Sequence, residues 1–202
     1  MNLSKSNTLK IVVLAAGFSR RLGTPKALAR IRGVSLLRLT VERLTALSPS
    51  PIIVVVPPRS HRYRIELRRQ RTLLVENTQR SLGLASSVRA GIRKARYSSG
   101  ILLLPVDLPA LRSPEIRRLI ERWRSSPRRV AARRIGAEGG TPLILPSRLY
   151  RAALRVQGDI GLRDLIRNLP LDQQALVDLF SAQTDVDTPE DLRNARRRMT
   201  PE

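Results

Sequence analysis

Short runs of aliphatic and β-branched residues alternate with amphipathic segments along almost the whole chain, and this alternation limits the fold more than any other feature. The runs that predict strands lie at residues 10–14, 52–56, 72–75, 101–104, 130–133, 143–145 and 175–179. The segments that predict helices lie at residues 34–47, 61–71, 84–97, 114–123, 147–156, 161–169 and 189–198. Strands that alternate with helices favour a mostly parallel sheet covered by helices on both faces. We therefore expect an α/β fold in three layers, with ligands bound beyond the carboxyl ends of the strands.

The length and charge of the chain limit the number of domains and the class of protein further. Its 202 residues favour one domain spanning 1–202. Lysine and arginine total 38 against 16 acidic residues, and the resulting net charge of +22 raises the question of nucleic-acid binding. Aromatic residues make up only 3%, however, and the arginines are spread over the predicted helices. We therefore do not expect nucleic acid as a partner, and a basic RNA- or partner-binding protein is kept as the non-enzymatic alternative.

The absence of cysteine and the single histidine exclude several kinds of chemistry. Disulfides, a thiolate nucleophile and zinc sites built on cysteine or paired histidines are ruled out. Any metal must be held by oxygen atoms, which favours Mg²⁺, with Mn²⁺ as the alternative. No apolar run approaches the roughly 18 residues of a membrane span, so we expect a cytoplasmic protein without membrane contact.

The loop after the first predicted strand has the composition of a polyphosphate site. It reads Leu14-Ala15-Ala16-Gly17-Phe18-Ser19-Arg20-Arg21-Leu22-Gly23-Thr24-Pro25-Lys26. Its glycines and alanines allow a ligand to approach the backbone closely, and Ser19 adds a hydroxyl. Arg21 and Lys26 supply positive charge, and residues 1–41 contain no carboxylate. The Walker A pattern is missing. The loop predicts a triphosphate site, and the alternative is a glycine-rich turn with surface cations.

Aspartates mark two further positions where a cation would be held. Asp107 follows the fourth predicted strand in a loop stiffened by two prolines, where a turn or helix cap is the alternative interpretation. Asp185 and Asp187 point the same way if their stretch is extended. Two further acidic residues fall in the first turn of the last predicted helix and are expected to be structural: Glu190 and Asp191. Asp107 is therefore placed to hold a cation, and Asp187 remains a candidate ligand.

The first loop resembles the L-A-A-G-x-S-x-R-x-G-x-x-K signature of the MobA-like nucleotidyltransferases, and it looks most like their molybdenum cofactor cytidylyltransferase branch. The resemblance runs from about residue 10 to residue 198 and implies a Rossmann-like three-layer fold of the nucleotide-diphospho-sugar transferase type. It implies that Arg21 and Lys26 hold the phosphates and stabilise the transition state. Asp107 and Asp187 are implied to bind the Mg²⁺ that bridges the phosphates, and Asp185 is a weaker candidate. The residues that it implies for nucleotide binding are Leu14, Ala15, Ala16, Gly17, Ser19, Arg21, Lys26, Gly83, Ser86 and Asp107.

Three other segments are similar to family motifs. Residues 77–87 resemble the G-[LM]-x-x-S segment that contacts base and ribose, although a simple helix cap would explain Ser86. Residues 139–142 resemble a G-H-P turn, but Thr141 stands where many relatives have histidine. Residues 158–163 resemble a G-D-x-G-x-R segment on the acceptor side. This last likeness implies that Arg163 meets the phosphate of the acceptor and that Asp159 orients the loop. A helix cap followed by a surface arginine is the alternative.

The resemblance implies an enzyme that transfers CMP from CTP to the terminal phosphate of a molybdopterin-type acceptor and releases pyrophosphate. Residues 10–110 would bind the nucleotide and residues 111–198 the acceptor. Ala16 favours CTP, because guanylyl-transferring relatives usually read L-A-G-G in this loop. A guanylyltransferase that uses GTP, or a nucleotidyltransferase for another phosphorylated metabolite, is the alternative. A molybdoenzyme or its chaperone is a candidate protein partner.

Overall fold

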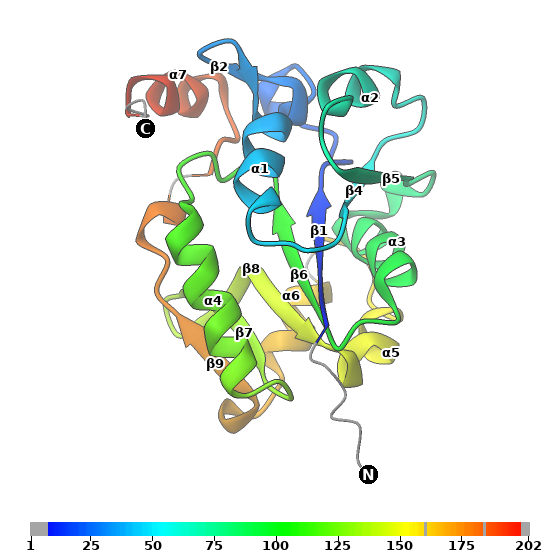
Figure 1. Ribbon diagram of the computed structural model, residues 1–202, viewed down its shortest axis with the longest axis vertical. Helices are drawn as coiled ribbons and strands as arrows, with labels where there is room; N and C mark the ends of the chain where they lie inside the picture. Colours follow the sequence, from blue (N-terminus) through cyan, green and yellow to red (C-terminus); the bar gives the residue numbers. More distant parts are fainter. Residues whose placement is uncertain (1–7, 160, 184, 199–202) are drawn as a thin grey trace.

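A seven-stranded sheet forms the centre of the molecule in the computed structural model, which describes residues 8–159, 161–183 and 185–198 (Figure 1). Its strands are β1 (Leu9–Leu14), β4 (Ile52–Val56), β5 (Thr72–Glu76), β6 (Gly100–Pro105), β7 (Val130–Ile135), β8 (Glu138–Pro146) and β9 (Gln174–Val177). Their order across the sheet is β5-β4-β1-β6-β8-β7-β9. Strand β8 is antiparallel to β6 and β7, and the other neighbouring strands are parallel. The mostly parallel sheet predicted from the alternation is therefore confirmed.

Helices cover both faces of this sheet. One face packs against α1 (Leu36–Thr45), α2 (His61–Leu67) and α4 (Ser113–Ser125). The other face packs against α3 (Leu84–Ala95), α5 (Tyr150–Ala153) and α6 (Gly161–Arg167). Among the described residues, no helix is both long and apolar enough to cross a membrane.

Strand β1 shows why the core strands are continuous apolar runs rather than alternating ones. Ile11 and Val13 pack into the cluster under α1, α2 and α4, whereas Val12 and Leu14 pack into the cluster under α3, α5 and α6. Side chains on a strand alternate between faces, so a strand that is buried on both sides needs apolar residues at every position. The run therefore fixes β1 at the centre of the sheet.

A small hairpin and the last helix form a third cluster. Strands β2 (Arg30–Ile31) and β3 (Val34–Ser35) pair antiparallel, and α7 (Pro189–Arg198) packs against them at one end of the molecule (Figure 1). This contact brings the end of the described chain back to the segment that follows the first loop.

Several element boundaries differ from the sequence prediction. The helix expected at residues 34–47 begins at Leu36, because Val34 and Ser35 belong to the hairpin and the Ser35 side chain accepts a hydrogen bond from the Arg38 N–H. The helix expected at 61–71 ends at Leu67. The segment expected as one helix at 147–156 is a 3₁₀ turn followed by the four-residue α5.

The topology gathers several loops at one edge of the sheet. The loops after β1 and β6 leave the same edge, because these strands are parallel neighbours. The backbone N–H of Val186, in the segment before α7, donates to the Asp107 carbonyl at 2.9 Å and joins that segment to the loop after β6. The edge thus collects the segments in which the sequence places its candidate site residues.

Candidate active site

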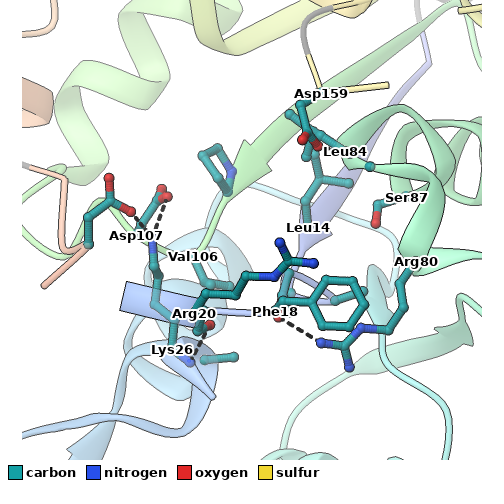
Figure 2. Close-up of a pocket in the computed structure, with 18 of the residues that line it drawn as sticks. Leu14, Phe18, Arg20, Lys26, Arg80, Leu84, Ser87, Val106, Asp107 and Asp159 are labelled. Carbon is teal, nitrogen blue, oxygen red and sulfur yellow. Dashed lines mark hydrogen bonds and ion pairs between the residues drawn. The ribbon is translucent and has the colours of Figure 1, made fainter. Parts of the chain in front are cut away.

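A cavity of about 380 Å³ opens at this edge of the sheet (Figure 2). Its walls come from the loop after β1, the turn before α3, the loop after β6 and the segment before α7. Most residues expected from the sequence to bind nucleotide line this cavity, namely Leu14, Ala15, Ala16, Gly17, Ser19, Arg21, Lys26, Gly83 and Asp107. Asp159 and Asp187 also line it.

One end of the cavity is a cluster of paired charges. The Nζ atom of Lys26 lies 3.1 Å from Asp107 Oδ2 and 2.6 Å from Asp187 Oδ1. Arg21 Nη2 donates to the other oxygen of Asp187 at 2.7 Å. The Lys26 side chain is only 13% exposed, whereas that of Arg21 is 70% exposed. Lys26 is therefore held in place by two carboxylates, and Arg21 contacts the carboxylate of Asp187 from the solvent side.

The charges in this cluster stabilise one another. Burial by itself would lower the pKa of the Lys26 ammonium, but the neighbouring Asp107 and Asp187 outweigh it and raise that pKa above its usual value. The hydrogen bond from Lys26 is the main reason that the pKa of Asp187 is lowered. Lys26 and Asp187 are thus both charged at neutral pH. An ammonium held in this way is suited to neutralise phosphate oxygens.

Local hydrogen bonds hold the first loop in its conformation. Ser19 lies in the left-handed region with φ 54°, and its hydroxyl accepts a hydrogen bond from the Lys26 N–H at 2.8 Å. This bond closes the loop over the 3₁₀ turn that contains Arg21. The Ser19 hydroxyl expected to meet the ligand therefore also positions Lys26.

The second carboxylate is oriented by the start of α7. Asp191 Oδ2 accepts hydrogen bonds from the backbone N–H groups of Asp187 and Thr188 at 3.0 and 2.8 Å. The Thr188 hydroxyl in turn accepts one from the Asp191 N–H at 3.2 Å. This reciprocal arrangement caps the helix. Asp191 is therefore structural, as expected, and it fixes the backbone that presents Asp187.

The donor set at this end fits a hard divalent cation. Asp107 and Asp187 both contact the Lys26 ammonium, so the two carboxylates lie close to one another. Mg²⁺ is commonly bound by one or two carboxylates together with substrate phosphates and water. In the described residues, no group of three or more histidine, cysteine, aspartate or glutamate side chains is arranged to hold a metal. The protein alone would therefore provide two ligands, and phosphate oxygens and water would provide the others.

Asp185, the weaker candidate ligand, faces a different partner. Its carboxylate lies 3.6 Å from Arg133 Nη1 on β7. Burial, followed by the nearby Asp107, raises its pKa. The structure thus places Asp185 close to the charged cluster but in an ion pair of its own.

The other end of the cavity is formed by the start of α3. Gly83 has φ 80°, and a side chain at this position would come within 2.7 Å of both Asp159 Oδ1 and the Gly158 carbonyl carbon. Asp159 Oδ1 accepts a hydrogen bond from the Leu84 N–H at 2.8 Å. Only glycine allows this close approach. Asp159 therefore holds the turn before α3, and its role in the acceptor-side loop stays a prediction from the resemblance.

The structure separates the two serines of this segment. Ser87 lines the cavity, whereas Ser86 does not. The Ser86 hydroxyl is buried, donates to the Gly83 carbonyl at 2.7 Å and accepts from Asn77 Nδ2 at 2.8 Å. Arg163 is exposed on α6 and does not line the cavity either. Contact of Ser86 with nucleotide and of Arg163 with acceptor remain predictions from the resemblance.

Phe18 and Arg80 are among the lining residues that the sequence analysis does not give as site residues. The Arg80 guanidinium lies 3.9 Å from the centroid of the Phe18 ring, and Arg80 Nη2 donates to the Gly17 carbonyl at 3.2 Å (Figure 2). Arg80 stands three residues before Gly83 in the segment that resembles the base-binding motif. That proximity is the only signal in the sequence that would have pointed to it.

Comparison with known proteins places the chain in a family. Residues 11–175 match the model of the MobA-like NTP transferase domain. The chain is 32% identical over 188 residues to a protein named probable molybdenum cofactor guanylyltransferase from Rhodopirellula baltica, and this match covers 90% of the chain and 88% of the relative. It is 30% identical over 195 residues to a protein named nicotine blue oxidoreductase from Paenarthrobacter nicotinovorans, with 90% and 93% covered. The chain therefore belongs to the MobA-like NTP transferase domain family, a family of nucleotidyltransferases.

Solved structures agree with this assignment. The crystal structure of Rv0371c from Mycobacterium tuberculosis superposes with a TM-score of 0.77 at 26% identity, and covers 95% of this chain and 98% of that one. The same protein has been solved in complex with manganese. The Rossmann-like fold of nucleotide-diphospho-sugar transferase type, which the sequence resemblance implied, is thereby confirmed.

Proposed function

We propose that this protein transfers a nucleotidyl group, CMP from CTP, to the terminal phosphate of a molybdopterin-type acceptor and releases pyrophosphate. The observation that carries the proposal is the contact of Lys26 with both Asp107 and Asp187 at one end of the cavity. A pure binding protein has no need for two carboxylates beside a partly buried ammonium. The family assignment supports the reaction type, and a relative named for molybdenum cofactor transfer supports the acceptor class.

The proposed chemistry is an in-line displacement. A terminal phosphate oxygen of the acceptor forms a bond to the α-phosphorus of the nucleotide. The bond from that phosphorus to the bridging oxygen breaks, and the electron pair leaves with pyrophosphate. A phosphate monoester is already anionic, so the protein needs no nucleophilic side chain. Its contribution is alignment and charge neutralisation.

Each charged residue has a role in this scheme. Lys26 and Arg21 hold the phosphates and neutralise the charge that develops on the leaving pyrophosphate. Asp107 and Asp187 hold the metal, Mg²⁺ or Mn²⁺, which supplies further neutralisation when bound. Asp187 also orients Lys26 and Arg21, because it accepts hydrogen bonds from both. Residues 10–110 bind the nucleotide in this proposal, and residues 111–198 bind the acceptor.

The choice of CTP rests on Ala16, which is buried in the loop beneath the cavity. GTP is the second candidate donor, because the Rhodopirellula relative carries a guanylyltransferase name. Thermal unfolding with Mg²⁺ and each nucleotide separates the two. A ligand that binds only the folded state raises the melting temperature, and at equal concentration the tighter ligand raises it more. We expect the larger rise with CTP, and a larger rise with GTP would refute the assignment of the base.

A pyrophosphate-release assay tests the reaction itself. Molybdenum-loaded and metal-free molybdopterin are each supplied with CTP or GTP and Mg²⁺. We expect release that depends on the acceptor. Tight RNA binding that falls steeply with salt, without any pyrophosphate release, would instead support the basic binding protein.

A further inference from the structure

The two ends of the cavity differ in chemistry, and this difference orients a nucleotide within it. Lys26 and Asp107 mark the phosphate end, whereas Ser87, Leu84 and Arg80 lie at the opposite end (Figure 2). A triphosphate held at Lys26 would direct the nucleobase towards the second end. The following inference rests on the proposed function, since it assumes that the cavity takes a nucleoside triphosphate.

Arg80 has hydrogen-bonding capacity that the protein does not use. Its Nη2 donates to the Gly17 carbonyl at 3.2 Å. Its Nε atom is buried and has no hydrogen-bond partner among the described residues. A buried N–H without an acceptor is costly, and guanidinium N–H groups bind well to paired acceptors on one plane. Arg80 is thus a donor that lacks an acceptor, in the wall of a ligand cavity.

Phe18 covers this guanidinium with an aromatic face. The ring lies 3.9 Å from the Arg80 guanidinium carbon and 5.4 Å from that of Arg20, and Figure 2 shows it between these two side chains. The Phe18 side chain is nonetheless 47% exposed, so its position depends on little burial. A flat ring stacked on a planar cation is also the arrangement in which proteins hold nucleobases.

We propose that Arg80 is the residue that binds the nucleobase of the donor nucleotide. The base displaces the Phe18 ring and stacks on the same face of the guanidinium in its place. Phe18 covers that face until the exchange. Every base has a π face, so this contact adds affinity for a nucleotide that carries a base over a bare triphosphate.

Binding measurements by calorimetry test this role with four probes, each in the presence of Mg²⁺: CTP, GTP, ATP and inorganic triphosphate. The last probe has the charge of the nucleotides but no base. Arg80→Ala removes the stack, and Arg80→Lys keeps the charge without the plane. Arg117→Ala removes one exposed positive charge on α4 as the matched control.

We expect Arg80→Ala to lower the affinity for the preferred nucleotide about 5- to 100-fold, which is the range for loss of one base stack. The affinity for inorganic triphosphate should fall by no more than about twofold. Arg80→Lys should lose most of the same affinity, and Arg117→Ala should change neither probe. Phe18→Ala should raise the affinity for the nucleotide by a few fold, since the base no longer competes with the ring for the guanidinium.

Two results would overturn the inference. An equal loss of nucleotide and inorganic triphosphate in Arg80→Ala would make Arg80 a phosphate ligand. Weaker nucleotide binding by Phe18→Ala would make the ring part of the binding surface rather than a competitor. Failure of the proposed function looks different, because the native protein would then release no pyrophosphate with any acceptor even if it bound nucleotide through Arg80.

Discussion

The Nζ atom of Lys26 lies 2.6 Å from Oδ1 of Asp187, although the two residues are 161 positions apart in the chain. The contact joins the loop after the first strand to the segment before the last helix. It exists only when the hairpin, α7 and the central sheet are assembled. The phosphate end of the cavity is therefore a product of the complete fold, and its charges can be tested one by one.

Loss of Lys26 or Asp107 should nearly abolish turnover. Lys26→Ala removes a partly buried cation, and Asp107→Ala removes one of the two proposed metal ligands. Loss of one preorganised charge typically lowers the rate by about 10²–10³. Pyrophosphate release measures this fall, and circular dichroism establishes that the fold is intact. Arg117→Ala, an exposed charge far from the cavity, should retain full activity. Near-normal release by either site variant would refute the assignment of the site.

Asp187 should stabilise the fold in a pH-dependent way. Its folded-state pKa is lowered, chiefly by the hydrogen bond from Lys26. A carboxyl with a lowered pKa contributes stability above its unfolded value of about 3.9, and this contribution disappears as the pH falls through the folded value. The stability advantage of the native protein over Asp187→Asn should therefore be present near neutrality and shrink below about pH 4.

Urea unfolding midpoints from neutral to acidic pH, in the presence of a chelator, measure this difference. Asp178→Asn is the control, because Asp178 pairs with Arg134 on the exposed surface. Parallel curves for the native protein and Asp187→Asn across the whole range would contradict the assigned ion pair.

Gly83→Ala should damage both stability and nucleotide binding. The added methyl would meet Gly158 backbone at 2.7 Å, and the residue would keep an unfavourable φ of 80°. We expect a loss of about 1–3 kcal/mol in the free energy of unfolding. Gly136→Ala is the matched control, since Gly136 has φ 60° but nothing within 4 Å of the added carbon. If both variants lose the same stability, the close approach at Gly83 has no importance of its own.

Ala16→Gly should move the base preference towards GTP. Ala16 is buried in the wall of the cavity, and the resemblance implies glycine at this position in relatives that transfer guanylyl groups. Relative kcat/KM for CTP and GTP measures the preference. We expect the ratio to fall by about tenfold, which corresponds to roughly 1.4 kcal/mol. An unchanged ratio would refute the role of Ala16 in base selection.

The core and the first loop follow from the sequence because their signals are local. The buried apolar run at residues 11–14 is dictated by burial on both faces of the sheet. The glycines after it are dictated by backbone conformation. The pairing of Lys26 with Asp187 is not local. The carboxylates were predicted as metal ligands from the resemblance, but nothing in the sequence places an ammonium between them.

Other features depend on the exact rotation of a helix or on tertiary contacts, and neither can be predicted from a local sequence pattern. Ser86 and Ser87 are adjacent on α3, and the rotation of about 100° between successive helical residues decides which one faces the cavity. The hairpin strands of two residues each are too short to show a period. Arg80 lies in a 3₁₀ turn, and its direction is set by Phe18 and Gly17, which are distant in sequence.

Identification of the reaction product tests the central claim most directly. The protein is incubated with CTP, Mg²⁺ and a molybdopterin-type acceptor, and the products are analysed by phosphorus magnetic resonance and mass spectrometry. The account predicts a dinucleotide in which CMP is joined to the acceptor through a new phosphoanhydride bond, formed together with one equivalent of pyrophosphate and lost in Lys26→Ala. Unchanged CTP and acceptor with either CTP or GTP as donor, or a product that forms equally well in Lys26→Ala, would contradict it.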